Sequence, residues 1–167
     1  MQLDAEQLVT ALASKIGSLA DDTVVVGIHS GGVWVAERLH QMLKAVPPLG
    51  TLAVTLHRDD FGKIGLHPQK KSTDMPINID GRHILLVDDV LHTGRTLRAA
   101  LNELFDFGRP ASVKLAVLVD RGGREMPVDA AFAAARIALP ATQRLSLARG
   151  EGGRFRFAVE TAEEGAA

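Results

Sequence analysis

Residues 84–97 read ILLVDDVLHTGRTL, and this stretch decides the fold. Its four leading aliphatic residues have the continuous apolar pattern of a strand buried on both faces. Asp88 and Asp89 follow where that strand reaches the surface, and Thr-Gly-Arg-Thr at 93–96 opens a helical pattern. In open parallel sheets, ligands bind beyond the carboxyl ends of the strands, and helix N-termini offer N–H groups to phosphate. The stretch therefore predicts a site for a phosphorylated sugar.

One other interpretation of residues 84–97 is an ordinary strand–helix connection in a Rossmann-like fold. Asp88 and Asp89 would then be no more than a solvated strand end. That interpretation leaves the adjacent carboxylates and the Thr-Gly-Arg-Thr turn together unexplained.

Outside this stretch, apolar residues recur with helical spacing in some segments and as continuous runs in others. Helices are predicted at 4–19, 33–43 and 97–105, and strands at 23–28, 52–56, 113–119 and 130–132. Asp4 is the predicted N-cap of the first helix, with Gln7 as its capping-box partner. Strand alternating with helix predicts a mainly parallel sheet. Residues 145–147 and 154–157 alternate like edge or hairpin strands and predict a small C-terminal cap, while the tail 161–167 is expected to fray.

Residues 58–80 have no sustained periodicity and contain two glycines, two prolines, three lysines and four aspartates. Loops of this length inside a compact domain are usually functional lids or binding loops. We therefore expect a flexible lid, with an irregular hairpin as the alternative.

Composition limits the class of protein. The 167 residues, 46% of them hydrophobic, match one domain spanning 1–167. A net charge of -1 excludes a global basic field for nucleic acid, so any RNA contact must be a local patch. There is no cysteine, the N-terminus lacks a basic start with an apolar core, and no apolar run approaches the roughly 18 residues of a membrane span. We expect a cytoplasmic protein.

The motif at 84–97 resembles the phosphoribosyl pyrophosphate (PRPP) motif of type I phosphoribosyltransferases. From about residue 26 to residue 124, the order of blocks is similar to the bifunctional pyrimidine operon regulator and uracil phosphoribosyltransferase family. That family reads VDDVLYTGRT where this chain has His92 in place of the tyrosine. The flanking blocks that favour this family are LHRDD at 56–60, GRP at 108–110 and LAVLVDRGGREMP at 115–127. The resemblance implies an α/β fold, with a parallel sheet flanked by helices, a flexible lid and a small C-terminal cap.

In such a site, one set of motif residues binds the phosphate and another binds the sugar ring. Backbone N–H groups and two hydroxyls of Thr93, Gly94, Arg95, Thr96 and Leu97 can bind the 5'-phosphate of the sugar, and Gly94 permits close approach. Asp88 and Asp89 can accept hydrogen bonds from the ribose hydroxyls. The two carboxylates also stabilise the positive charge that develops on the sugar ring as pyrophosphate leaves.

By the resemblance, His29, Ser30, Gly31 and Gly32 form the pyrophosphate loop, and Arg58 reaches the same pyrophosphate, unless it only pairs with a neighbouring aspartate. The family's pattern in this loop is Thr-Arg-Gly, so the missing arginine leaves pyrophosphate affinity and catalytic strength open. A Mg2+ cofactor is expected, held mainly by substrate oxygens and water, with Asp88 and Asp89 as possible ligands. No spacing of the histidines indicates a zinc or iron site.

The resemblance assigns uracil recognition to Val119, Asp120 and Arg121, largely through backbone groups. Closure of the lid would exclude water from the reacting carbon. His92 has two interpretations: its charge near pH 6.5 tunes phosphate binding, or it only packs against the lid.

The family's second activity is UMP-dependent binding of pyrimidine operon leader RNA, which attenuates transcription. Residues 136–156 contain five arginines and one acidic residue. The arginines are either candidates for RNA contact or scattered solubilising residues: Arg136, Arg144, Arg149, Arg154 and Arg156. The first helix offers a single lysine, whereas regulators of this type tend to carry arginines there. Three hypotheses follow: an enzyme making UMP from uracil and PRPP, a UMP-sensing RNA-binding regulator with residual catalysis, and a purine phosphoribosyltransferase without an RNA role. Family resemblance also implies a homo-oligomer.

Overall fold

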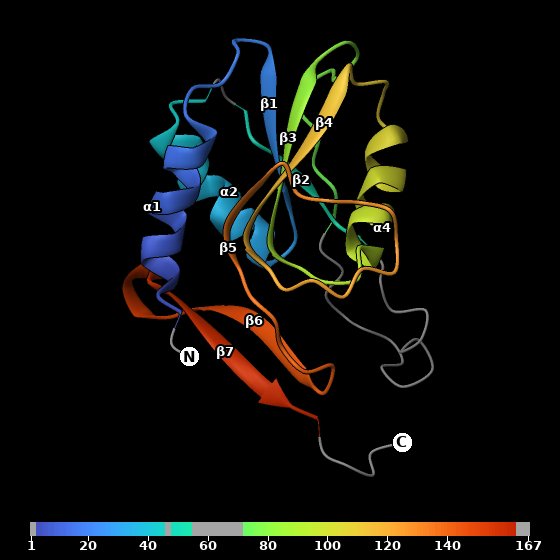
Figure 1. Ribbon diagram of the computed structural model, residues 1–167. Coiled ribbons are helices and arrows are strands. Elements are labelled where there is room, and N and C mark those ends of the chain that lie inside the picture. Colours follow the sequence, from blue (N-terminus) through green and yellow to red (C-terminus); the bar gives the residue numbers. More distant parts are fainter. Residues whose placement is uncertain (1–2, 46–47, 55–71, 163–167) are drawn as a thin grey trace.

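The computed structural model describes residues 3–45, 48–54 and 72–162, which form a parallel sheet covered by helices on both faces (Figure 1). The elements in chain order are α1 (Ala5–Ile16), β1 (Thr23–Ile28), α2 (Gly31–Met42), β2 (Gly50–Leu52), β3 (His83–Leu91), α4 (Arg95–Phe105), β4 (Ser112–Asp120), β5 (Phe132–Arg136), β6 (Gln143–Arg149), a short 3-10 turn (Glu151–Gly153) and β7 (Phe155–Thr161). The five strands β2-β1-β3-β4-β5 lie in that order and all neighbours are parallel. The predicted α/β class is confirmed.

Two apolar cores hold the helices to the sheet. Helices α1 and α2 pack on one face, where Leu12 and Leu39 are fully buried, and α4 packs on the other through Leu97, Ala100 and Leu104. Each fully buried leucine contributes on the order of 1.5–3 kcal/mol relative to an exposed one. The predicted cap of α1 is present, since the backbone N–H of Gln7 donates to the Asp4 carboxylate at 3.2 Å.

The antiparallel hairpin β6–β7 confirms the predicted C-terminal cap and lies beyond the carboxyl ends of the sheet strands (Figure 1). Its apolar face joins the α1/α2 core through Leu145, Leu147 and Phe155. Arg38 on α2 anchors it: one Nη donates to both Glu6 carboxylate oxygens at 3.0 and 3.1 Å, and the other donates to the carbonyl oxygen of Gly153 at 3.0 Å. The Arg38 guanidinium also lies 4.2 Å from the centre of the Phe155 ring.

Three predicted strand boundaries were wrong. The strand expected at 52–56 lies at Gly50–Leu52, because its hydrogen bonds go to the last residues of β1, and the structure describes this segment only to Val54. The strand expected at 130–132 begins at Phe132 and runs to Arg136, where pairing with β4 sets its register. The last strand continues to Thr161, which pairs with Gln143 and is therefore not part of a frayed tail. Residues 163–167 of that tail lie outside the described residues.

The predicted lid at 58–80 falls largely outside the described residues, including Arg58 and everything up to residue 71. Its last part is anchored to the sheet edge and to α4. Asp74 forms an antiparallel bridge with Thr51, the Thr73 hydroxyl donates to Glu103 at 2.9 Å, and Ile79 is fully buried. Within the described ranges, no helix has the length and apolarity needed to cross a membrane.

Candidate active site

The carboxyl ends of the neighbouring strands β1, β3 and β4 open into one cavity of about 510 Å³, and the hairpin closes its far side. Every sheet strand is parallel, so the segments that follow β1, β3 and β4 meet at the same edge. The lining residues are His29, Ser30, Gly31, Asp88, Asp89, Val90, His92, Thr93, Thr96, Arg121, Ala141, Gln143, Arg144, Leu145 and Ser146. The structure thus brings together the predicted acidic pair, the start of the phosphate turn, the pyrophosphate loop and Arg121.

Asp88 and Asp89 occupy the last part of β3 and are half-buried. Asp88 Oδ1 accepts the backbone N–H of Asp89 at 2.9 Å, and Asp89 Oδ1 accepts that of Val90 at 2.8 Å, so both carboxylates are held in place. Burial, and then the neighbouring charge of Asp89, raise the pKa of Asp88 well above its usual value. Two acids held this close favour a cationic ligand or a sugar hydroxyl that donates to them.

The predicted pyrophosphate loop needs a glycine at position 32 because α2 begins directly against β3. A Cβ at Gly32 would lie 2.5 Å from the Val87 carbonyl oxygen and 3.0 Å from the Asp88 Cα, which are backbone atoms. A Cβ at Gly31 would collide with the Asp89 carboxylate. Gly31, which stands in place of the family's arginine, therefore lets Asp89 lie against the first turn of α2. The peptide bond between His29 and Ser30 is cis.

The phosphate turn is a left-handed residue followed by a helix start. Gly94 has φ +92°, and α4 begins at Arg95 without a side-chain cap, so its first turn presents N–H groups toward an anion. The Thr93 hydroxyl accepts the Arg95 N–H at 3.2 Å. The Arg95 side chain points elsewhere, because its Nε donates to Glu125 at 2.7 Å. Arg95 can thus serve a phosphate through its backbone while its side chain ties α4 to the loop after β4.

Asp120, a predicted base-binding residue, is the centre of an ion-pair cluster. Its side chain is only 5% exposed and accepts from both Nη atoms of Arg124 at 2.8 and 2.7 Å, from Arg136 at 2.6 Å and from the Gly122 N–H at 3.0 Å. The hydrogen bonds from Arg124 are the main reason that the pKa of Asp120 is lowered. Val119 is fully buried as well. Of the three predicted base residues, Arg121 is the one that lines the cavity.

Arg124 was missed by sequence reasoning, although it stands in a block that the resemblance singled out. Besides Asp120, it donates to the carbonyl oxygens of His92 at 3.1 Å and Val128 at 3.0 Å. It therefore clamps the loop after β4 to the phosphate turn after β3. The Asp-x-x-x-Arg spacing at 120–124 was the available signal, since the segment between the two residues is short enough to turn back on itself.

The ring of His92 packs beside Gly123 of this loop. Burial, followed by the charge of Arg121, lowers the pKa of His92. A lowered pKa means that less of the His92 ring is charged near pH 6.5, which disfavours the interpretation in which its charge tunes phosphate binding. Its Nδ1 is buried and has no hydrogen-bond partner among the described residues.

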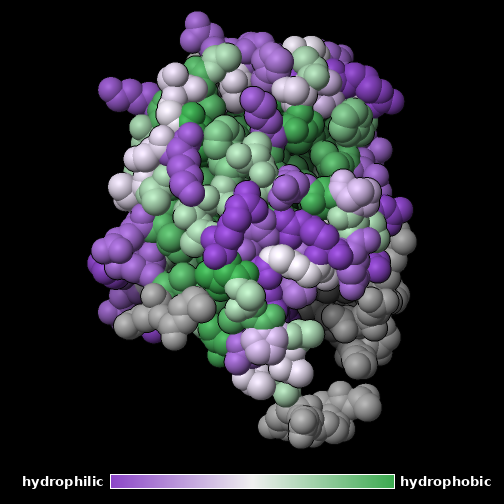
Figure 2. Space-filling view, in the orientation of Figure 1, coloured by the Kyte–Doolittle hydropathy of each residue, from purple (hydrophilic) through white to green (hydrophobic). Residues whose placement is uncertain are grey.

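The five arginines considered for RNA do not form one group. Arg136 lies on β5 and pairs with Asp120, and Arg149 stacks over Trp34 at 4.8 Å. Arg144 and Arg156 are exposed on one face of the hairpin, with Arg144 also lining the cavity, and Arg154 is exposed at the turn before β7. Hydrophilic residues form a band across the middle of the face shown in Figure 2, between areas of hydrophobic surface.

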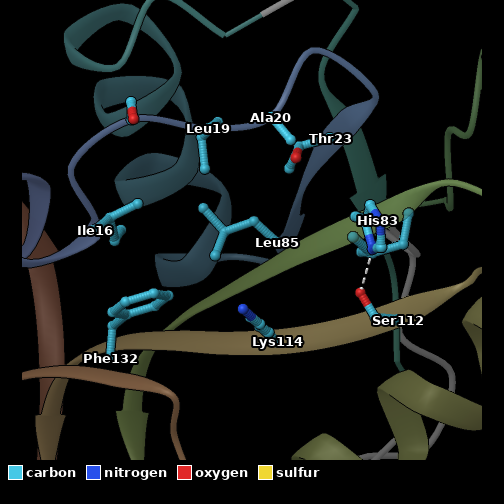
Figure 3. A pocket seen from close by; sticks show the side chains of 11 residues that line it. Ile16, Leu19, Ala20, Thr23, His83, Leu85, Ser112, Lys114 and Phe132 are labelled. Carbon is cyan, nitrogen blue, oxygen red and sulfur yellow. Dashed lines mark hydrogen bonds between the residues drawn. The ribbon is translucent and has the colours of Figure 1, made fainter.

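A second pocket, of about 360 Å³, lies at the opposite edge of the sheet, among the amino ends of β1, β3 and β4 (Figure 3). Its walls include Leu19, Leu85 and Phe132, and at its rim His83 Nδ1 is 2.6 Å from the Ser112 hydroxyl. It lacks paired carboxylates and a helix N-terminus. We therefore take the cavity at the carboxyl ends of the strands as the candidate active site.

Comparisons with known proteins show the family to which the chain belongs. A family model described as the phosphoribosyl transferase domain matches residues 2–136. The bifunctional protein PyrR of Ralstonia nicotianae is 51% identical over 162 residues, covering 93% of this chain and 92% of that protein. The chain belongs to the PyrR family of phosphoribosyl transferases. The bifunctional protein PyrR of Pseudomonas paraeruginosa is 53% identical over 122 residues, covering 73% of this chain and 72% of that one.

Solved structures confirm the fold. A hypoxanthine-guanine phosphoribosyltransferase of Bacillus anthracis matches with a TM-score of 0.65 at 22% identity, covering 82% of this chain and 83% of that one. A hypoxanthine phosphoribosyl transferase of Trypanosoma cruzi matches with a TM-score of 0.61 at 24% identity, covering 83% and 78%. Identities this low show the fold alone, so the choice of base has to be argued from the residues of the site.

Proposed function

We propose that this PyrR family member transfers the phosphoribosyl group of PRPP to uracil, forming UMP and pyrophosphate, and that its UMP-bound form binds pyrimidine operon leader RNA. One observation carries the catalytic half: an adjacent carboxylate pair and a left-handed glycine turn into α4 face the same cavity. The relatives that are called bifunctional support the double role. The hairpin shares one core with the sheet and with α1 and α2, and α4 packs on the other face of the same sheet, which supports a single domain over 1–167.

The phosphoribosyl group is bound at three points in this proposal. Its 5'-phosphate accepts from the N–H groups of residues 93–97 and from the hydroxyls of Thr93 and Thr96. Its ribose hydroxyls donate to Asp88 and Asp89. Its pyrophosphate lies toward the first turn of α2, which contributes a positive helix end, and Arg58 is the proposed clamp from outside the described residues. The sugar carbon C1' is thereby placed over the acidic pair.

Bond breaking at C1' leaves positive charge on the sugar ring, and the fixed carboxylates of Asp88 and Asp89 stabilise it electrostatically. The same carboxylates would hold one or two positions around a Mg2+ ion. Bound there, Mg2+ would supply positive charge that offsets the charge of the pyrophosphate leaving group. Among the described residues, no group of three His, Cys, Asp or Glu side chains is placed to hold a metal.

The catalytic half is tested by pyrophosphate release from PRPP and Mg2+ with a panel of bases. Uracil should turn over faster than hypoxanthine or guanine. Faster turnover with a purine would establish the purine enzyme instead, and background rates with every base would remove the enzymatic function.

For RNA, the proposed contacts are the exposed arginines of the hairpin, Arg144, Arg154 and Arg156, with smaller parts for Arg149 and Arg136, which already have partners. UMP should strengthen binding to a leader hairpin RNA, and a scrambled RNA should bind more weakly. The slope of affinity against salt would count the phosphate contacts. Equal affinity for both RNAs, with or without UMP, would contradict this half. We further propose a homo-oligomer, which light scattering would test.

A further inference from the structure

The pocket of about 360 Å³ at the amino ends of β1, β3 and β4, here called the amino-end pocket, exists because α1 stops short of covering them (Figure 3). The helix ends at Ile16, and Gly17 follows with φ +71° while its N–H donates to the Ala13 carbonyl oxygen at 3.0 Å. In the connection to β1, the short side chains of Ser18 and Ala20 line the pocket and leave its space unfilled.

The strand register shows which side chains form the floor of the amino-end pocket. Leu85 on β3 pairs with Val25 on β1 and with Lys114 on β4, and residues paired across strands project from the same face of a sheet. That face carries the core under α1 and α2, in which Val25 and Leu85 are buried. Lys114 is therefore a lysine on the core-facing side of an inner strand, whose next six residues are all buried. Inner strands of parallel sheets are normally apolar on both faces, so a charge at this position is unusual.

The charge of Lys114 has no counter-charge in the part of the chain that the structure describes, where it forms neither a hydrogen bond nor an ion pair. Its side chain is exposed and points toward the space between Leu85 and Phe132 (Figure 3). None of the described residues that line the pocket is acidic. At the rim, His83 and Ser112 already satisfy one another through their 2.6 Å hydrogen bond. The pocket thus combines apolar walls, one aromatic ring and one positive charge without a counter-charge.

We propose that the amino-end pocket binds a small organic anion with a flat apolar body and a single acidic group. The body packs between Leu85, Leu19 and Phe132, and the acidic group accepts from the Lys114 ammonium. Sites for small molecules have volumes from about 300 Å³ upward and are mostly apolar, with a few polar groups that fix the orientation of the ligand. One lysine matches one negative charge, which separates this ligand from polyphosphates such as PRPP.

The amino-end pocket is independent of the candidate active site. The two lie at opposite ends of β3, whose nine residues rise about 3.3 Å each, so they are roughly 25 Å apart. A ligand in the amino-end pocket therefore leaves the carboxyl edge free for a nucleotide. The inference does not depend on the proposed transfer to uracil.

The test uses 8-anilinonaphthalene-1-sulfonate, a fluorescent probe with an aromatic body and one sulfonate. N-phenyl-1-naphthylamine is the matched neutral probe, because it has the same rings without the sulfonate. Fluorescence titration of the full chain should show one site for the sulfonate probe, with the same affinity in the presence of excess UMP. Lys114→Met should weaken binding of the sulfonate probe about 5-fold, as expected for one exposed ion pair, and change the affinity of the neutral probe less than about 2-fold.

Two further variants separate the pocket from the rest of the surface. Ala20→Phe fills the pocket without removing a charge and should abolish binding of both probes. Lys15→Met is the matched control, because Lys15 donates to the Ala133 carbonyl oxygen at 2.8 Å and does not line the pocket. It should leave both affinities unchanged, and circular dichroism would confirm that each variant folds.

Equal effects of Lys114→Met on the two probes would overturn the inference, as would wild-type binding of the sulfonate probe by Ala20→Phe. Displacement of the sulfonate probe by UMP would place it in the cavity at the carboxyl edge and overturn the inference as well. A probe affinity that falls as the protein concentration rises would show that a second copy of the chain occupies the pocket, in place of a small anion.

Discussion

Replacing Arg124 with methionine removes the main partner of a buried carboxylate while keeping much of the side-chain volume. Asp120 loses two charge-assisted hydrogen bonds of 2.8 and 2.7 Å, and the carbonyl oxygens of His92 and Val128 lose one donor each. Breaking a buried ion pair from one side costs about 3–5 kcal/mol. Arg136 still holds Asp120, but its side chain is 60% exposed and therefore screened. We expect the free energy of unfolding to fall by about 3 kcal/mol, the lower end of that range.

The matched control is Arg95→Met, which removes an ion pair to Glu125 whose side chains are 59% and 51% exposed. Its cost should stay below about 1 kcal/mol. Urea denaturation at pH 7 measures both variants. Because the pKa of Asp120 is lowered in the folded protein, the stability from its pair is present above the unfolded value near 3.8 and is lost as the pH falls through the lower folded pKa. The reasoning fails if the two variants lose equal stability at pH 7, or if the Arg124 effect persists unchanged at pH 2.

Three further predictions concern the acidic pair, the pyrophosphate loop and the hairpin. Asp88→Asn should raise the stability at pH 7, because the raised pKa of Asp88 in the folded protein means that folding disfavours its charged form. The gain in stability should vanish as the pH falls toward 4, and a difference that does not depend on pH would refute this prediction. Gly32→Ala should cost about 1–3 kcal/mol and weaken PRPP binding, measured by denaturation and calorimetry, because its Cβ meets backbone atoms; wild-type values would contradict the packing. Arg144→Gln with Arg156→Gln should lower the salt slope of RNA binding by about 2 without preventing UMP formation, and an unchanged slope would exclude these contacts.

The substrate class was predictable because its information is local. A buried strand, two acids, a left-handed glycine and a helix start follow one another within 84–97, so their relative positions are fixed by short-range geometry. The meeting of this turn with the segments after β1 and β4 followed from the parallel sheet, which the alternation of strands and helices predicted.

The features that escaped sequence reasoning depend on contacts between distant segments. The cluster in which Asp120 pairs with both Arg124 and Arg136 depends on the register between β4 and β5. The sequence of β5 is rich in alanine and does not reveal that register. The wall formed by Gln143 and Ser146 depends on how the hairpin docks on α1 and α2 through Arg38 and Phe155. The early position of β2 reflects pairing with the end of β1, whereas the β-branched residues beyond Leu52 favoured a later strand.

The most direct test of the central claim is the rate of UMP formation by Asp89→Asn from uracil, PRPP and Mg2+. Wild-type protein should release one pyrophosphate for each UMP formed. If the sugar reacts over the acidic pair, the variant should fold and yet react about 100- to 1,000-fold more slowly, because it lacks a negative charge that stabilises the transition state. An Asp89→Asn variant that forms UMP at the wild-type rate would show that the sugar does not react at the carboxyl edge of β3.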